Sequence, residues 1–173
     1  MPSLQDLKTR IASVKSTQKI TSAMKMVAAA KLRRAQEAAE SARPYASRME
    51  LMVASLAETM EGFEGAPPLL AGKGKADVHL IVLCTSDRGL CGGFNGSLIR
   101  AARHMAAGLE SEGKTVKFLC VGRKGHDVIK RERPGDIVGD FTGLGRRGLE
   151  YGEAREVGMR IIELFADDAF DVC

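Results

Sequence analysis

Residues 3–60 contain no glycine and a single interior proline, Pro44, and this feature constrains the chain more than any other. The stretch is rich in Ala, Lys, Arg, Met, Gln and Glu, all of which favour the α-helix. Ser3 is suited to cap its start, with Asp6 three positions further on as a capping-box partner. A continuous helix of this length spans about 80 Å. The stretch therefore predicts an extended element and not an ordinary globular helix.

A heptad repeat explains how such a long helix is stabilised. Counted from Leu4, apolar side chains recur at most a and d positions as far as Leu56. This pattern predicts one strand of a left-handed coiled coil, and its many alanines let a partner helix approach closely. The predicted coiled-coil seam comprises Leu4, Leu7, Ile11, Val14, Ala28, Leu32, Met49, Val53 and Leu56.

The seam is interrupted in one window, where polar residues occupy its positions: Gln18, Thr21 and Lys25. In the same window three apolar side chains fall outside the seam: Ile20, Met24 and Val27. Two interpretations remain open, a register device or stutter of the coiled coil and a surface presented to a third body. Pro44 removes one helix hydrogen bond, and the sequence leaves open whether it bends the helix or ends it.

Positive charge is concentrated at the beginning of the chain. Residues 1–36 hold eight basic side chains and one acid, Asp6, a net charge of +7, whereas the whole chain carries +4. Such a concentration indicates an acidic partner for this segment. Nucleic acid is disfavoured, because here the basic residues and the heptads overlap, whereas in DNA-binding zippers the basic segment precedes the coiled coil.

A different pattern follows the helix. Residues 61–75 combine glycines with a proline pair, which predicts a linker between a coiled-coil domain, residues 1–60, and a second domain, residues 76–173. In the second domain apolar runs alternate with amphipathic segments, which predicts βαβ units around a parallel sheet. The expected strands are 78–83, 115–121 and 136–141, the expected helices are 95–112, 125–133 and 150–166, and a glycine- and arginine-rich loop is expected at 142–148.

The predicted fold class is therefore α/β, a long N-terminal coiled-coil helix followed by a Rossmann-like parallel-sheet domain. Residues 171–173 (DVC) are in the same phase as Asp77 and Val78 and predict the start of a further strand. A coiled-coil strand without its partner and a sheet interrupted at the start of a strand lead us to expect a domain that is incomplete at its C-terminus.

The loop after the first expected strand is a candidate ligand site. Residues 86–96 lie between a strand and a helix, where α/β proteins bind phosphates with backbone N–H groups. Their glycines match neither G-x-G-x-x-G nor the Walker pattern, so we interpret the loop as a tight turn. The residues expected to shape this turn are Asp87, Arg88, Gly89, Gly92 and Gly93.

Catalytic and metal-binding patterns are missing from the sequence. The three histidines have no nucleophile placed near them by sequence, and the four cysteines show no CxxC spacing. We therefore expect no active site, no metal and no cofactor. Cys84 and Cys120 lie in apolar runs and are predicted to be buried thiols in a reducing compartment. No apolar run is long enough to span a bilayer.

Two long motifs resemble one known family. Residues 11–29 (IASVKSTQKITSAMKMVAA) are similar to the N-terminal helix of the γ subunit, the central rotor stalk, of F-type ATP synthases. Residues 86–95 (SDRGLCGGFN) resemble that family's loop after its first strand. The motifs stand in the family's order, and the resemblance extends over essentially the whole chain. It implies a non-catalytic subunit that couples rotation of a membrane ring to ATP synthesis or hydrolysis.

The resemblance also implies partners. In the family, the N-terminal helix pairs antiparallel with a C-terminal helix inside a hexamer of α and β subunits. The α/β foot domain lies outside the hexamer, above the membrane c-ring, and contacts the ε subunit. The resemblance further implies that acidic lever segments of β meet the helix within the polar window of the seam. The residues that would carry this rotor–β contact are Lys19, Ile20, Met24, Lys25 and Val27.

The family continues beyond the length of this chain with the second coiled-coil helix. The implied location is peripheral, at the cytoplasmic face of the bacterial inner membrane, and the start directly at the helix favours a bacterial origin. Two rival functions remain: a nucleotide-binding α/β enzyme with a helical dimerisation arm, and a basic coiled-coil protein that binds nucleic acid. Saturable nucleotide binding at residues 86–96 would favour the first, and steeply salt-dependent DNA binding by residues 1–60 the second.

Overall fold

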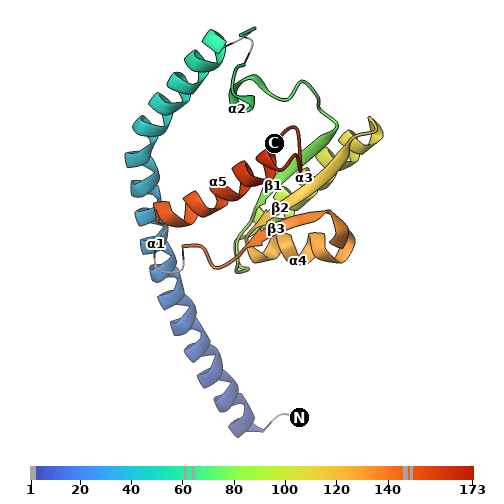
Figure 1. Cartoon of the computed structure of the whole chain (residues 1–173). Coiled ribbons are helices and arrows are strands. Elements are labelled where there is room, and N and C mark those ends of the chain that lie inside the picture. Colours follow the sequence, from blue (N-terminus) through green and yellow to red (C-terminus); the bar gives the residue numbers. More distant parts are fainter. Residues whose placement is uncertain (1–2, 61, 64, 146–147, 149) are drawn as a thin grey trace. The chain divides into compact units, whose positions relative to one another are not determined.

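The computed structural model describes residues 3–60, 62–63, 65–145, 148 and 150–173. The chain divides into two compact units, Met1–Glu61 and Gly62–Cys173. The first unit is the helix α1 (Leu4–Met60), and the second holds the remaining helices and strands (Figure 1). Residues 61 and 64 of the predicted linker, and residues 146 and 147 of the predicted glycine- and arginine-rich loop, lie outside the described residues.

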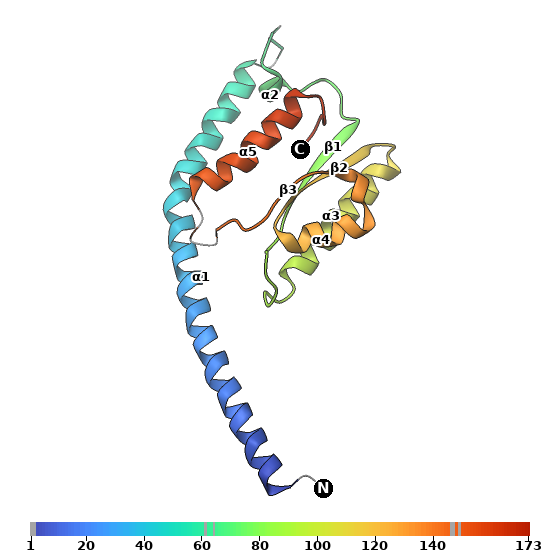
Figure 2. The same cartoon turned by 60° about the horizontal axis from the view of Figure 1, so that its bottom comes forward.

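The first unit is one continuous helix. Pro44 lies inside α1 and does not end it, which settles the question that the sequence left open. Figure 2 shows α1 as a single, gently curved helix along its whole length. The predicted capping box is present at the start, since the backbone N–H of Asp6 donates to Ser3 Oγ, and Asp6 Oδ2 accepts from the backbone N–H of Ser3 at 2.9 Å. The hydrogen bond that Ser3 Oγ donates to Asp6 Oδ2 at 2.7 Å, followed by the one from the Ser3 backbone N–H, lowers the pKa of the Asp6 carboxyl.

The second unit is a three-layer α/β domain. Its sheet has the order β1 (Val78–Cys84), β2 (Thr115–Val121) and β3 (Ile137–Phe141), with both pairs parallel. Two helices, α3 (Phe94–Ser111) and α4 (Arg123–Glu132), connect these strands. Two further helices are α2 (Pro68–Ala71) and α5 (Tyr151–Ala166), and Pro134–Asp136 forms a 3-10 turn before β3. The predicted fold class, a long helix followed by a parallel-sheet α/β domain, is confirmed.

Two apolar cores lie on opposite faces of the sheet, because successive side chains of a strand point to opposite faces. On β2, Phe118 and Cys120 pack with Ile99 and Ala102 of α3 and with Ile129 of α4. Leu119, between them in sequence, packs with Leu80 of β1, Leu164 of α5 and Phe170 instead. Figures 1 and 2 show the corresponding layers, with α3 and α4 on one face of the sheet and α5 on the other.

Residues after α5 return to the open edge of β1. His79 and Val172 form an isolated parallel bridge, in which the backbone N–H of Leu80 donates to Val172 O at 2.8 Å. The further strand expected at 171–173 is thus present as a single bridge. Val172 pairs with one edge of β1, and β2 pairs with the other edge. The residues after α5 therefore extend the sheet on the side of β1 opposite to β2 and β3.

The segment predicted to be a linker, residues 61–75, contains a short helix and is bound to the rest of the second unit. Residues 68–71 form α2, and Lys73 is held by the second unit: its Nζ donates to the carbonyl of Phe165 at 2.5 Å, to Asp168 Oδ1 at 2.7 Å and to the carbonyl of Phe170 at 3.2 Å. Nζ also lies 4.2 Å from the centre of the Phe165 ring. All three donors of the amine are used, so this segment is anchored to the end of α5.

One prediction about the cysteines is wrong. Cys120 is buried as expected, and burial raises the pKa of its thiol to about 11. Cys84 is exposed instead. It occupies the last position of β1, where the strand leaves the core, and an apolar run in the sequence does not reveal that its final residue projects beyond the packed layers.

The backbone crosses closely at the carboxyl end of β1. Gly122 has a φ of +102°, and a Cβ atom on it would lie 2.0 Å from the carbonyl oxygen of Thr85. Gly125, on the first turn of α4, would place a Cβ 2.9 Å from Thr85 Oγ1. Both positions therefore require glycine, and they allow α4 to begin directly against the end of β1.

We predict that Gly122→Ala destabilises the chain by about 2–4 kcal/mol, because the added carbon meets backbone in a left-handed conformation. Gly135→Ala is the matched control, since a Cβ there meets nothing within 4 Å. Urea unfolding of both variants measures the difference. Equal stabilities of the two variants would contradict the close crossing.

Asp171 holds the start of β1. Its Oδ2 accepts the backbone N–H groups of Val78 at 2.9 Å and Asp77 at 3.0 Å, and Lys75 Nζ lies 3.3 Å from its Oδ1. The hydrogen bond from Val78, followed by those from Asp77 and Lys75, lowers the pKa of this carboxyl. A carboxyl whose pKa is lowered by folding stabilises the fold above its unfolded pKa, and this contribution is lost as the pH falls through the folded pKa.

We predict that Asp171→Asn lowers the thermal stability at pH 7, because the carboxylate is lost as an acceptor. The gap in melting temperature between the wild type and the variant should narrow as the pH falls from about 4, the pKa of the carboxyl in the unfolded chain, towards its lowered pKa in the folded chain. Thermal unfolding between pH 7 and pH 3 tests this. A gap that stays constant over that range would show that the charge of Asp171 does not contribute.

Candidate interaction site on the long helix

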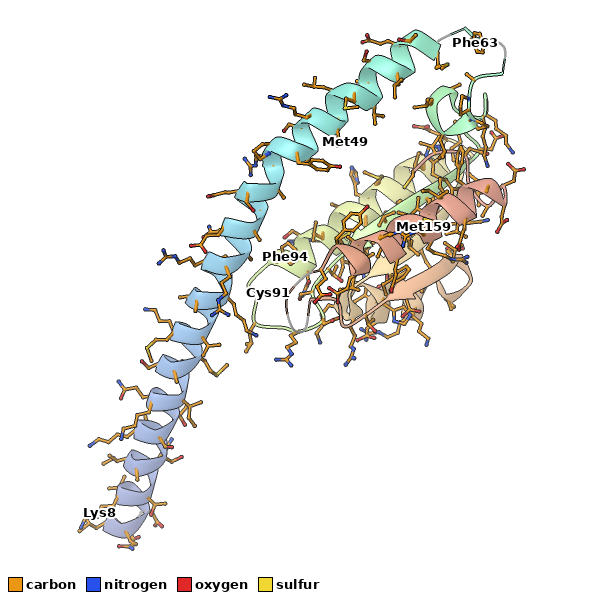
Figure 3. All side chains as sticks on the ribbon, turned by 60° about the vertical axis from the view of Figure 1, so that its left-hand side comes forward. Lys8, Met49, Phe63, Cys91, Phe94 and Met159 are labelled. Atoms are coloured by element: carbon orange, nitrogen blue, oxygen red, sulfur yellow. The ribbon has the colours of Figure 1, made fainter. Side chains whose placement is uncertain are left out.

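The sides of α1 are its main candidate functional surface. None of its residues, Leu4–Met60, is buried, and Figure 3 shows side chains leaving the helix all around its axis. Seam residues are therefore open, with Leu4 71% and Leu32 60% exposed. A soluble helix that leaves a long apolar stripe uncovered presents a surface for another helix.

The five residues expected to contact a partner do not share one face. Ile20, Met24 and Val27 follow the spacing i, i+4, i+7 and lie on one side of α1, each more than half exposed. We call these three residues the apolar patch. Lys19 and Lys25 leave the helix roughly 100° from their neighbours Ile20 and Met24, on opposite sides of the patch. The helix thus separates the two charges from the apolar group that the sequence placed beside them.

Basic residues extend two sides of α1. Lys31 and Arg34 follow Met24 and Val27 by seven residues each and continue the side of the apolar patch. A second group lies on the side that also carries Lys19, and its other members are Lys8, Lys15 and Arg33. Arg33 pairs with Glu37 at 2.9 Å. Positive charge therefore lies on more than one side of the helix.

The polar window of the seam is a hollow on the surface of α1. Its walls are formed by six residues: Val14, Thr17, Gln18, Thr21, Ser22 and Lys25. The threonine hydroxyls turn inward, since Thr17 Oγ1 donates to the carbonyl of Ser13 at 3.0 Å and Thr21 Oγ1 donates to that of Thr17 at 2.8 Å. The hydroxyl of Thr21, one of the three residues that made this window polar in the sequence, thus already has a partner in the helix backbone.

The loop after β1 is the second candidate. It lies at the switch point of the sheet, because β2 flanks β1 on one side and Val172 on the other, and ligands bind α/β sheets at such points. In this chain the carboxylate of Asp87 occupies the switch point. Asp87 Oδ1 accepts the backbone N–H of Arg123 at 2.9 Å, and Asp87 Oδ2 accepts that of Gly143 at 2.6 Å.

The backbone N–H groups in the first turn of α4 also have hydrogen-bond acceptors within the chain. After Arg123, the N–H of Lys124 donates to Ser86 O at 3.1 Å and that of Gly125 to Thr85 Oγ1 at 2.8 Å. These N–H groups belong to α4, which lies beside the loop, whereas residues 86–96 themselves lead into α3. An internal carboxylate, a carbonyl and a hydroxyl take them here, so the geometry supports the interpretation as a structural turn.

The residues predicted to shape this turn have different roles. Asp87 bridges three loops, and Gly92 adopts a φ of +59° that favours glycine. Gly93 precedes α3, and its carbonyl accepts the N–H of Ser97 at 2.9 Å. Gly89 has open space around it, and Arg88 is exposed. The structure gives neither Gly89 nor Arg88 a packing role.

Sequence reasoning missed several residues that fix this region. Asn95 Oδ1 accepts the backbone N–H of Ser86 at 2.9 Å, which ties the start of the loop to α3. Glu153 accepts the N–H of Gly145 at 3.0 Å and that of Glu150 at 3.1 Å, so it caps α5 and holds the loop after β3. Glu153 stands three positions after Glu150, and that capping spacing was readable in the sequence.

One side chain of the loop is held out into solvent. Leu90 has a φ of +66° and is 96% exposed, and Phe94, labelled in Figure 3 at the start of α3, is 51% exposed. A bulky residue in the left-handed region is unfavourable, and a leucine is rarely this exposed. The tip of the loop is therefore a second apolar surface of the chain.

A hollow of about 740 Å³ lies between α2 and the end of α5. Leu69, Ile162 and Phe165 line it, and Lys73 lies at its side with all its donors satisfied. Two further charged residues line it, Lys75 and Asp168, and they pair with Asp171 and Lys73. Within the described ranges, no group of three or more His, Cys, Asp or Glu side chains could hold a metal ion. No described helix is long and apolar enough to cross a membrane.

Comparisons with known proteins identify the family. A family model described as ATP synthase matches residues 3–173. The chain belongs to the ATP synthase family. It is 56% identical over 173 residues to the ATP synthase gamma chain of Rhodospirillum rubrum, covering all of this chain and 58% of that relative. It is also 56% identical to the gamma chain of Brucella anthropi, with 100% of this chain and 59% of the relative covered.

A solved structure of the same family agrees in fold. The central stalk and c-ring of the Tetrahymena thermophila mitochondrial ATP synthase contain a chain that matches with a TM-score of 0.62 at 25% identity. The match covers 82% of this chain and 58% of that one. The present chain thus spans less than two thirds of the length of these members of the ATP synthase family.

We predict that Asp87→Ala destabilises the chain by about 1–3 kcal/mol, because it leaves the N–H groups of Arg123 and Gly143 without their acceptor. Arg88→Ala, at the exposed neighbouring position, should change the stability little. Urea unfolding of the two variants separates them. If Asp87→Ala proved as stable as Arg88→Ala, the carboxylate would not be what closes this loop.

Proposed function

We propose that this chain is the N-terminal part of the central rotor subunit of a proton-translocating F-type ATP synthase. It is non-catalytic, and it couples rotation of the membrane ring to ATP synthesis or hydrolysis at the α and β subunits. In this proposal α1 is one strand of the shaft and residues 62–173 belong to the foot. The observation that carries the proposal is a helix of 57 residues with no buried residue, in a chain 56% identical to ATP synthase gamma chains.

The mechanical role fits the physical character of α1. A shaft must stay helical over a long distance and present different side chains in different directions as it turns. Residues 4–60 do this without a glycine, and α1 carries an apolar seam, the apolar patch and basic residues on separate sides. Torque then passes through side-chain contacts, so no catalytic group on this chain is needed.

We propose that the apolar patch, Ile20, Met24 and Val27, is the centre of the contact with the lever segments of β. Its three exposed side chains can enter an apolar pocket of a partner, and Lys31 and Arg34 on the same side can pair with acidic groups beside that pocket. A contact of Lys19 and Lys25 with β stays a prediction, since these side chains leave α1 in other directions.

The remaining partners follow from the same role. We propose that the foot meets the ε subunit and the c-ring, with the exposed tip of the loop at Leu90 as one of its contact surfaces. The location is then the membrane-bound complex, with this subunit peripheral at the cytoplasmic face of a bacterial inner membrane. The nucleotide-binding alternative is disfavoured by the closed turn at Asp87, and no structural observation favours a nucleic-acid function.

The proposed contact can be tested in the complete ATP synthase that contains this subunit. Met24→Glu places a negative charge against acidic lever segments and should lower ATP-driven proton pumping by about threefold or more, while the complex still assembles. Met26→Glu is the matched control, because Met26 is an exposed methionine, 66% against 54% for Met24, on a different side of α1. Pumping and ATP hydrolysis are measured on membranes carrying each variant.

The experiment has three distinct outcomes. Reduced pumping with Met24→Glu alone supports the apolar patch as the contact. Equal effects of Met24→Glu and Met26→Glu would contradict a one-sided contact. Failure of the wild-type subunit to assemble with α and β subunits would contradict the proposed function itself.

A further inference from the structure

Lys73 is a nearly buried lysine in the segment between α1 and the sheet, with only 11% of its side chain exposed. Its ammonium group donates to the carbonyl of Phe165, to Asp168 Oδ1 and to the carbonyl of Phe170, and it lies over the Phe165 ring. Removing an ammonium group from water is unfavourable unless its donors find acceptors, and here all three do. Lys73 therefore has a defined position in the second unit.

The end of α5 has the charge that such a lysine requires. Phe165 lies in the last turn of α5, where the backbone carbonyls attract a positive charge. Asp168 has a φ of +54°, a left-handed conformation that glycine or asparagine commonly takes after a helix. Here this position carries a carboxylate. The hydrogen bond from Lys73, followed by its positive charge, lowers the pKa of that carboxyl, so the pair is ionised at neutral pH.

Two further lysines bind the residues that follow α5. Lys75 Nζ lies 3.3 Å from Oδ1 of Asp171, whose Oδ2 accepts backbone N–H groups at the start of β1. Lys117 of β2 donates to the carbonyl of Ala169 at 2.8 Å. The chain just before β1 and the chain just after α5 are thus held together and to the sheet by several charged groups.

The position of Lys73 along the chain decides what its attachment does. Within this chain one covalent connection joins α1, which ends at Met60, to β1, which starts at Val78. Among the described residues of this connection, Lys73 is the first whose side chain forms a hydrogen bond to a residue distant in sequence. The next to be anchored, Lys75, is half exposed and pairs with a single carboxylate. Lys73 thus marks the point at which the connection becomes part of the second unit.

We propose that Lys73 is a positioning residue of the rotor, which fixes the point where the shaft helix is joined to the foot. This inference rests on the proposed function, in which the connection is pulled whenever the shaft turns against a resisting membrane ring. Three acceptors and an aromatic ring surround the ammonium group, so a pull has to break several contacts at once. Loss of Lys73 lengthens the part of the connection that yields before a contact with the foot breaks.

The anchor itself is tested on the isolated full-length subunit by amide hydrogen exchange. Lys73→Met keeps an unbranched apolar side chain and removes all three donors, and it should speed exchange in residues 68–77 by about tenfold. Lys130→Met is the matched control, because Lys130 is an exposed lysine on α4. Exchange in β2 should stay unchanged in both variants. Equal protection of residues 68–77 in the two variants would overturn the anchor.

The mechanical role is tested in the complete ATP synthase, by ATP-driven proton pumping against an increasing opposing gradient. With little opposing gradient, the Lys73→Met and Lys130→Met enzymes should pump equally. Against a large gradient, Lys73→Met should pump about twofold less or lower, because a connection that opens more readily under load lets ATP hydrolysis proceed without turning the ring.

The dependence on the gradient separates a mechanical role from a merely structural one. An equal loss of pumping by Lys73→Met at every gradient, or no loss at any gradient, would overturn the positioning role. Assembly of the wild-type subunit with α and β subunits is scored separately. Its failure would contradict the proposed function, whereas the exchange measurement on the isolated subunit reports on the anchor alone.

Discussion

The structure depends on the burial of one apolar seam that α1 cannot bury by itself. Helix propensity contributes only tenths of a kcal/mol per residue, whereas burial of a leucine or isoleucine side chain contributes about 1.5–3 kcal/mol. The open seam, with side chains such as Ile11 and Leu32 exposed, therefore holds most of the stabilisation that a partner helix can provide. Under the proposed function, the rigidity of the shaft and the transmission of torque depend on that pairing.

The second unit is stabilised differently. Two cores on opposite faces of a parallel sheet bury Phe118, Leu119 and Ile129 completely, and internal carboxylates close the loops that α/β domains commonly leave open for ligands. Asp87 holds the turn after β1, Glu153 holds the loop after β3, and Asp171 holds the start of β1. These charges act within the fold, where they hold loops and the start of a strand in place.

Much of this could be predicted from the sequence, because the signals were periodic and long. The absence of glycine and the heptads predicted α1, and the alternation of apolar runs with amphipathic segments predicted the three strands and their helices. Long-range contacts were not predictable in this way. The crossing of Gly122 over Thr85 and the anchoring of Lys73 depend on residues far apart in sequence, and neither leaves a local pattern.

The candidate site, too, could be predicted from the sequence only in part. The sequence drew attention to the window at 18–27, but only the helix geometry separates the apolar patch from Lys19 and Lys25. Composition made Thr21 look polar, although its hydroxyl is bound to the backbone and its methyl group is left for packing. A residue type predicts which chemistry is available, while the side of the helix and the local hydrogen bonds decide which partner can use it.

The central claim, that this chain is the shaft helix and part of the foot of a rotary ATP synthase, is tested most directly by exchange. Residues 1–173 would replace the matching 58% of the Rhodospirillum rubrum gamma chain, and ATP synthesis driven by a proton gradient would be measured in membranes. The account predicts an assembled complex that still synthesises ATP. An assembled complex that hydrolyses ATP without moving protons, or a failure to assemble, would contradict it.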